Sequence, residues 1–108
     1  MIIPRFKAIR RAMEVIEQVA SGCKSFKIGK SHDLEQRMKE PDYDGVYDHM
    51  ESLFTSGSKE LVGFVEASFI DACMADFPDK CDNKKDGEKS LNDPMPESKE
   101  YHVYIVWR

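Results

Sequence analysis

The sequence predicts an α+β domain, because helical and strand-like patterns alternate in the order α, β, α, β, α, loop, β. Residues 4–20 and 59–77 repeat apolar side chains at helical spacing, whereas the C-terminal YHVYIVWR is rich in the branched and aromatic residues that favour a strand. A chain of 108 residues can bury one hydrophobic core but not two. We therefore expect residues 1–108 to form a single domain.

The first half of the predicted domain contains a helix, a strand and a short helix. Residues 1–22 are expected to form an N-terminal helix that Ser21 and Gly22 end with a left-handed cap. Residues 23–29 alternate in the manner of a strand, and a capping box at Asp33 predicts a helix over 34–40. The apolar stripe of the first helix is predicted to comprise Phe6, Ile9, Met13, Ile16 and Ala20.

The second half begins with loop-like sequence up to His49. The segment MESLFTS, residues 50–56, is expected to be a strand that stops at Gly57, and residues 59–77 have the strongest helical pattern in the chain. Residues 78–100 are highly charged and contain few apolar side chains, so we expect a long, mobile loop. The last strand then runs to the C-terminus.

Charge is distributed unevenly along the chain. The net charge is −4, but residues 1–40 hold nine lysines and arginines against five acidic residues, and residues 41–108 hold seven against fifteen. An acidic protein is not a general nucleic-acid binder. A polyanionic partner would therefore be met by the first forty residues.

The cysteines and the hydropathy favour a cytoplasmic protein with no membrane segment. No run of eighteen apolar residues is present, so no membrane span is expected. Cys23, Cys73 and Cys81 are odd in number and include no C-x-x-C pair, which favours reduced thiols. The histidines have no zinc-ligand spacing relative to these cysteines.

Glu66 occupies an unusual position for a carboxylate. On a helical wheel it falls near the centre of an apolar face, within about 60° of Val62, Phe69, Ile70, Cys73 and Phe77. Removing its charge from water costs several kcal/mol unless something compensates. One interpretation is a structural ion pair, or an apolar stripe whose end reaches water. The other is a ligand for a hard cation or an acid/base group in a cleft.

The segment FKIGKSHDLEQR, residues 26–37, is a second candidate. Gly29 would let a ligand approach the backbone, Lys30 would supply a charge, and Arg37 lies about one turn into the helix that follows. The segment lacks the full spacing of a nucleotide-binding P-loop. It is either a phosphate site or an ordinary strand-to-helix turn.

Together these segments resemble the GIY-YIG nuclease domain. That family has a strand ending in Y-I-G or K-I-G, an arginine eight residues after the glycine, a further strand, a helix with one glutamate, and then an asparagine. Here K-I-G ends at Gly29, followed by Arg37, strand 50–56, Glu66 and Asn83, so the match covers residues 24–85.

The first strand of the family, G-I-Y, does not precede residues 24–29. The C-terminal H-V-Y, residues 102–104, resembles it. We therefore expect a rearranged strand order, in which the last strand fills the first strand's place beside residues 24–29. The resemblance then implies a small three-stranded antiparallel sheet flanked by helices, with 1–22 as an added helix and 78–100 as the connection that permits the rearrangement.

The resemblance implies a metal-dependent DNA endonuclease that hydrolyses phosphodiester bonds. Glu66 would bind Mg²⁺ or Mn²⁺, Arg37 would hold a phosphate oxygen, and Tyr104 would orient or deprotonate the attacking water. Lys27 or Lys30 would lower the pKa of Tyr104 for that purpose. In this scheme Lys30, His32 and Asn83 contact substrate; His32 is an alternative base, and Asn83 positions the DNA backbone or holds Glu66.

Two departures from the family pattern support other interpretations. Lys27 replaces the first tyrosine of Y-I-G, and His102 replaces the glycine of G-I-Y, where it could crowd or assist the site. These changes and the acidic second half favour a catalytically inactive module that binds nucleic acid or protein. A small structural or regulatory domain without a nucleic-acid role also stays open. No separate DNA-binding domain is visible, so specificity would come from a dimer or from a DNA-binding partner protein.

Overall fold

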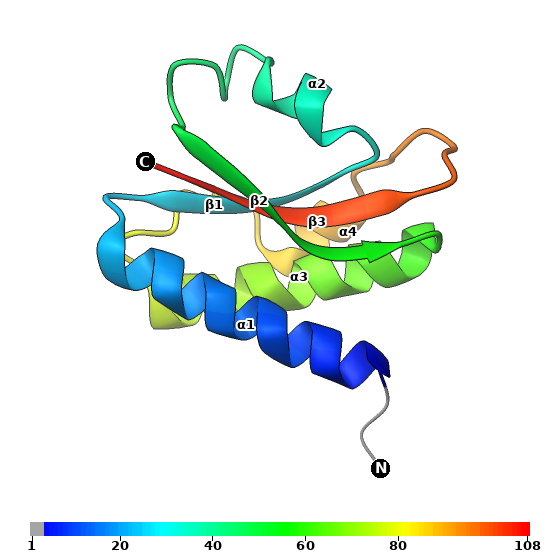
Figure 1. Ribbon diagram of the computed structural model, residues 1–108, viewed down its shortest axis with the longest axis horizontal. Coiled ribbons are helices and arrows are strands. Elements are labelled where there is room, and N and C mark those ends of the chain that lie inside the picture. The colour runs from blue at the N-terminus through cyan, green and yellow to red at the C-terminus, as the bar shows by residue number, and fades with distance from the viewer. Residues whose placement is uncertain (1–3) are drawn as a thin grey trace.

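The computed structural model describes residues 4–108 and has the predicted α+β architecture, with a three-stranded antiparallel sheet and four helices (Figure 1). The strands are β1 (Phe26–Ser31), β2 (His49–Ser56) and β3 (Tyr101–Trp107). The helices are α1 (Pro4–Gly22), α2 (Leu34–Met38), α3 (Lys59–Asp76) and α4 (Gly87–Leu91).

The C-terminal strand lies at the centre of the sheet. The strand order is β1-β3-β2, and β3 is antiparallel to both neighbours. Along β1 the register places Lys27 opposite Val106 and Gly29 opposite Tyr104. The predicted pairing of the last strand with the K-I-G strand is therefore confirmed, and it places residues 101–107 beside residues 26–31.

Different elements cover the two faces of the sheet. Helices α1 and α3 lie on one face, and the segment that carries α2 lies on the other (Figure 1). The main core lies on the α1–α3 side, where Ile28, Val103 and Ile105 of the sheet pack against Ile16 and Ile70. A smaller core on the α2 side is built from Tyr43, Tyr47, Tyr104 and Val106.

The first two elements differ in detail from the prediction. Phe6 and Met13 are 53% and 47% exposed, whereas Ala12, Ile16 and Ala20 are buried, so the stripe is rotated toward the alanines. Small residues let the helix approach the sheet closely. Strand β1 starts three residues later than predicted, at Phe26. The left-handed cap at Gly22 is also wrong, because Gly45 is the one residue in the described range with a positive φ.

The connection between α3 and β3 is more ordered than the predicted loop. It contains α4, and residues 80–83 run along the free edge of β1. Phe26 N–H donates to the Lys80 carbonyl at 2.9 Å, and Asp82 N–H donates to the Phe26 carbonyl at 2.7 Å. An unpaired strand edge is open to association with other chains. Charged sequence therefore serves here to cover an edge, a role that composition does not reveal.

Candidate active site

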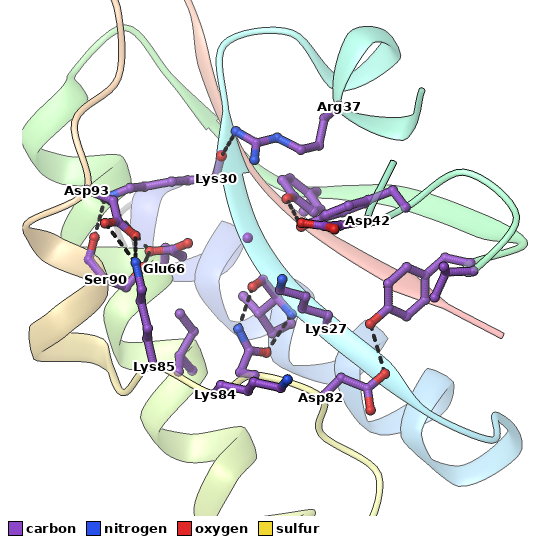
Figure 2. A pocket seen from close by; sticks show the side chains of 18 of the residues that line it. Lys27, Lys30, Arg37, Asp42, Glu66, Asp82, Lys84, Lys85, Ser90 and Asp93 are labelled. Carbon is purple, nitrogen blue, oxygen red and sulfur yellow. Dashed lines mark hydrogen bonds and ion pairs between the residues drawn. The ribbon is translucent and has the colours of Figure 1, made fainter. Parts of the chain in front are cut away.

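A pocket of about 670 Å³ lies beside β1, between the segment that contains α2 and the connection that contains α4 (Figure 2). Its lining gathers positive charge, with six lysines and arginines against four acidic residues, although the chain as a whole carries −4. Such a concave, cationic surface suits an anionic ligand. The charged lining residues are Lys27, Lys30, Arg37, Lys84, Lys85, Arg108, Asp42, Glu66, Asp82 and Asp93.

All four residues predicted to be catalytic line this pocket. Lys27 comes from β1, Arg37 from α2, Glu66 from α3 and Tyr104 from β3. Lys30 and Asn83, predicted to contact substrate, line it as well. His32 does not belong to the lining and its side chain is exposed, so the prediction that it reaches the site is wrong.

Gly29 leaves space for a tyrosine rather than for a ligand. A Cβ atom at this position would fall on the hydroxyl and ring of Tyr104, its register partner on β3. The phenol therefore crosses over the β1 backbone and is 1% exposed. The glycine that looked like a phosphate-loop residue is instead what allows Tyr104 to enter the wall of the pocket.

The Tyr104 hydroxyl forms a hydrogen bond of 2.5 Å with the hydroxyl of Tyr43. The two rings meet edge-on, with centroids 6.0 Å apart. Burial raises the pKa of Tyr104 far above its ordinary value, and the neighbouring Tyr43 raises it further. The lowered pKa that a general base requires is therefore not provided. Tyr104 is suited to orient a ligand as a neutral phenol.

Lys27 approaches the same pair of tyrosines. Its Nζ lies 5.3 Å from the centroid of the Tyr43 ring, a distance at which a cation is attracted by an aromatic face. Tyr47, one helical turn after Tyr43, donates to Asp82 Oδ2 at 2.8 Å. Burial and this bond to Asp82 raise the pKa of Tyr47, so it too stays neutral.

Glu66 is buried and has two polar neighbours. It is 3% exposed, its Oε1 accepts a hydrogen bond of 2.6 Å from the Ser90 hydroxyl, and Lys30 Nζ lies 3.9 Å from the same oxygen (Figure 2). Burial raises the pKa of Glu66, while the bond from Ser90 and the charge of Lys30 oppose that rise. The ion pair anticipated as one explanation of this residue is therefore present.

The Lys30 ammonium is buried and already has a hydrogen-bond partner in the protein. It is 9% exposed, and its Nζ donates to the Ser90 carbonyl at 2.9 Å. Ser90 thus contacts both members of the Lys30–Glu66 pair. A direct contact between Lys30 and a substrate would require this bond to be exchanged.

Arg37 lines the pocket, and its guanidinium contacts two neighbouring residues. One terminal nitrogen donates to the Lys30 carbonyl at 3.4 Å, and the other lies 3.4 Å from Glu40 Oε2. Its Nε is buried and has no hydrogen-bond partner within the described residues. A buried donor without a partner is uncommon, and a guanidinium matches the oxygens of a phosphate.

Asn83 has a structural role that the sequence prediction did not foresee. Its Oδ1 accepts from Ile28 N–H at 2.9 Å, and its Nδ2 donates to the Ile28 carbonyl at 2.8 Å. The amide therefore pairs with the free edge of β1 as another strand would. Both ends of the amide are occupied by Ile28, so of the two roles expected for Asn83 the contact with Glu66 is not present.

His102 lies on β3, where its register partners are Ser31 of β1 and Thr55 of β2. Its Nδ1 is 3.0 Å from Thr55 Oγ1, and its Nε2 is 3.3 Å from Glu100 Oε1. It does not line the pocket. The replacement of glycine by His102 therefore neither crowds nor assists this site.

Glu66 can serve a divalent cation only together with other ligands. Between residues 4 and 108 no group of three or more histidines, cysteines, aspartates or glutamates is arranged to hold a metal. Mg²⁺, however, commonly uses one or two carboxylates and takes its other ligands from water and substrate phosphate. A cation at Glu66 would therefore take its other ligands from water and phosphate, and it would share the carboxylate with Lys30, whose Nζ lies 3.9 Å from Oε1.

Several residues of the pocket could not be found from local patterns. Tyr43 and Tyr47 lie in a segment without periodicity, although their spacing of four hinted at one face of a turn. Ser90 gave no signal, because it sits in charged sequence far from both of its partners. Its importance emerges only from the way α4 packs on α3.

Comparison with models of known protein families, with curated proteins and with solved structures returned no match. Within the described chain, no helix combines the length and the apolar character needed to cross a bilayer. The fold therefore identifies the chain as an α+β domain and no more. The pocket is the feature that bears on its function.

Proposed function

We propose that this protein hydrolyses phosphodiester bonds in DNA with the help of Mg²⁺ or Mn²⁺, in the manner of the GIY-YIG nucleases that its sequence resembles. One observation carries the proposal. Lys27, Arg37, Glu66 and Tyr104 come from four different elements and line one pocket. The resemblance of the sequence to the GIY-YIG domain points to the same four residues, and Tyr104 reaches the pocket from the C-terminal strand.

The cationic residues bind and orient the phosphate in this proposal. Arg37 offers the N–H groups of its guanidinium to a non-bridging oxygen and offsets negative charge that develops there. Lys27 adds positive charge beside Tyr43, and Lys84 and Lys85 extend the cationic surface along the connection. Together they would draw the DNA backbone into a pocket on an otherwise acidic protein.

Glu66 and Tyr104 act at the reacting group. Glu66 would hold the metal ion, which supplies charge stabilisation at the phosphate and the leaving oxygen. Tyr104 donates or accepts a hydrogen bond as a neutral phenol and so orients the attacking water. Because burial raises its pKa, we do not assign it the role of the base that removes a proton from that water.

A second function, binding of nucleic-acid phosphates without hydrolysis, is favoured by a specific observation. Glu66 is already engaged by Ser90 and Lys30, and Tyr104 is bonded to Tyr43. A module that had lost catalysis would keep the cationic lining while its acidic and phenolic groups became internal supports. Such a protein would still bind DNA, but Glu66 would then contribute to stability alone.

We further propose a reducing, cytoplasmic setting and a partner that supplies sequence specificity. The free state of Cys23, Cys73 and Cys81 supports the first. The need for a partner follows from the small size of the pocket relative to a DNA-binding surface. Either a second copy of the chain or a separate DNA-binding protein would supply the sequence specificity.

Nicking of DNA distinguishes the two functions. Supercoiled and branched DNA should be incubated with the protein in Mg²⁺, Mn²⁺ or EDTA, and the products resolved on gels. Glu66→Gln keeps an acceptor for Ser90 and removes the charge, while Glu14→Ala changes an exposed helical glutamate as a control. Metal-dependent nicking that Glu66→Gln abolishes and Glu14→Ala retains supports hydrolysis. DNA binding without nicking supports the binding module, and absence of both refutes the two.

A further inference from the structure

Ser90 contacts both charged residues at the inner wall of the pocket. Its hydroxyl donates to Glu66 Oε1 at 2.6 Å, and its carbonyl accepts from Lys30 Nζ at 2.9 Å. All three residues are buried: Ser90 is 7% exposed, Lys30 is 9% exposed and Glu66 is 3% exposed. Lys30 also lies 3.9 Å from Oε1, so both neighbours approach the same oxygen and Oε2 takes part in neither contact. Figure 2 shows the three side chains converging at one side of the pocket.

The position of Ser90 is set by close packing between α4 and α3. Gly87 N–H donates to Asp71 Oδ1 at 2.8 Å, and a Cβ at Gly87 would collide with the carbonyl oxygen of Ala67 on α3. Asp86 caps α4 by accepting from Lys89 N–H at 2.9 Å. Only a glycine allows this close approach between α4 and α3. The approach places Ser90 within hydrogen-bond distance of Glu66.

We propose that Ser90 is a positioning residue that holds the Glu66 carboxylate in one fixed arrangement for cation binding, while its carbonyl holds the Lys30 ammonium. This inference rests on the proposed function, because it assigns Ser90 a role toward the metal that Glu66 would hold. A hydroxyl that donates to a carboxylate favours its ionised form and restricts its rotation. Partners that orient a metal ligand in this way commonly contribute 10- to 100-fold, roughly, to metal affinity.

The contact also links the connection between α3 and β3 to the site. That connection was expected to be a passive loop, but it supplies Asn83 to the edge of β1 and Ser90 to the charged pair. Ser90 makes the position of Glu66 depend on the packing of α4. Displacement of α4 should then weaken cation binding even when Glu66 and Ser90 are both unchanged.

Mn²⁺ affinity of the DNA-free protein tests this role. Free Mn²⁺ can be measured by electron paramagnetic resonance during titration of the full chain, with circular dichroism to confirm folding. We expect Ser90→Ala to weaken binding by roughly 10- to 100-fold. Ser90→Thr keeps the hydroxyl and should retain most of the affinity. Gly87→Ala should weaken binding because its Cβ pushes α4 away from α3.

Ser98→Ala is the matched control, since Ser98 lies exposed in the same connection and outside the pocket. It should bind Mn²⁺ as the wild-type protein does. Wild-type affinity in Ser90→Ala would overturn the inference and leave the proposed function standing. Equal losses in Ser90→Thr and Ser90→Ala would also overturn it, because the hydroxyl would then be irrelevant. If the wild-type protein bound no Mn²⁺, the proposed metal-dependent function would fail and this inference with it.

Discussion

Replacement of Gly29 by alanine should damage the pocket more than its small size suggests. The added Cβ would fall on the hydroxyl and ring of Tyr104. That ring is fully buried and its hydroxyl is bonded to Tyr43, so it cannot move aside without breaking this bond and disturbing the smaller core. The clash is with the end of a side chain that is held by its hydrogen bond to Tyr43 and by packing in the smaller core.

The magnitude follows from two contributions. Overpacking a well-filled core typically costs about 1–3 kcal/mol, and loss of the hydrogen bond between the two tyrosines adds about 1 kcal/mol. The expected loss is therefore about 2–4 kcal/mol, a large part of the stability of a small domain. In a domain of this size it corresponds to a decrease in Tm of roughly 10–25 °C.

Urea unfolding followed by circular dichroism measures this loss directly. Gly22→Ala provides the control, because a Cβ there meets nothing within 4 Å and stability should be unchanged or slightly raised. In the double variant with Tyr104→Leu the clash is relieved, so the two losses should be less than additive. The reasoning is refuted if Gly29→Ala is no more destabilised than Gly22→Ala, or if the double variant shows simple additivity.

Three further predictions concern the groups around the pocket. Asn83→Ala removes both bonds to Ile28 and should lower the free energy of unfolding by about 2 kcal/mol, as measured in urea; an unchanged value would show that the β1 edge needs no cover. Because burial raises the pKa of Glu66 above its ordinary 4.5, its proton is bound more tightly in the folded state. Wild-type protein should therefore lose stability relative to Glu66→Gln as the pH rises from below 4.5 through the higher folded pKa, and a gain over this range would contradict the assigned direction. In an alkaline titration followed by tyrosinate absorbance, Tyr47 and Tyr104 should ionise above the ordinary pKa of 10.0, and Tyr→Phe variants identify their signals; ionisation near 10 would place them in water.

Local patterns were sufficient to predict most elements and several pocket residues. The helical period of 59–77 marked Glu66 as a carboxylate on an apolar face, and it is indeed buried. For Glu66 the signal lies within a few neighbouring residues, where periodicity and side-chain type determine which face is buried. The pairing of the C-terminal strand with the K-I-G strand is also correct, but it followed from the resemblance to the GIY-YIG domain and not from a local pattern.

The features that the sequence did not reveal depend on contacts between distant segments. Ser90 lies 24 residues from Glu66 and 60 from Lys30, and no local pattern relates them. Asn83 lines the pocket as predicted, but its pairing with the β1 edge was not foreseen. For Gly29 the sequence left a phosphate site and an ordinary turn open, and neither alternative included the Tyr104 ring that the register of β3 places against it. Register and edge pairing arise only when the sheet is assembled.

The central claim is that Glu66 holds a divalent cation in the cationic pocket, and localisation of Mn²⁺ tests it most directly. In NMR spectra of the isotope-labelled protein, Mn²⁺ broadens the signals of nearby nuclei. Our account predicts that broadening at low Mn²⁺ concentration is centred on Lys30, Glu66 and Ser90, and that Glu66→Gln removes it. Broadening centred instead on the acidic turn at residues 42–48, or unaffected by Glu66→Gln, would contradict the account.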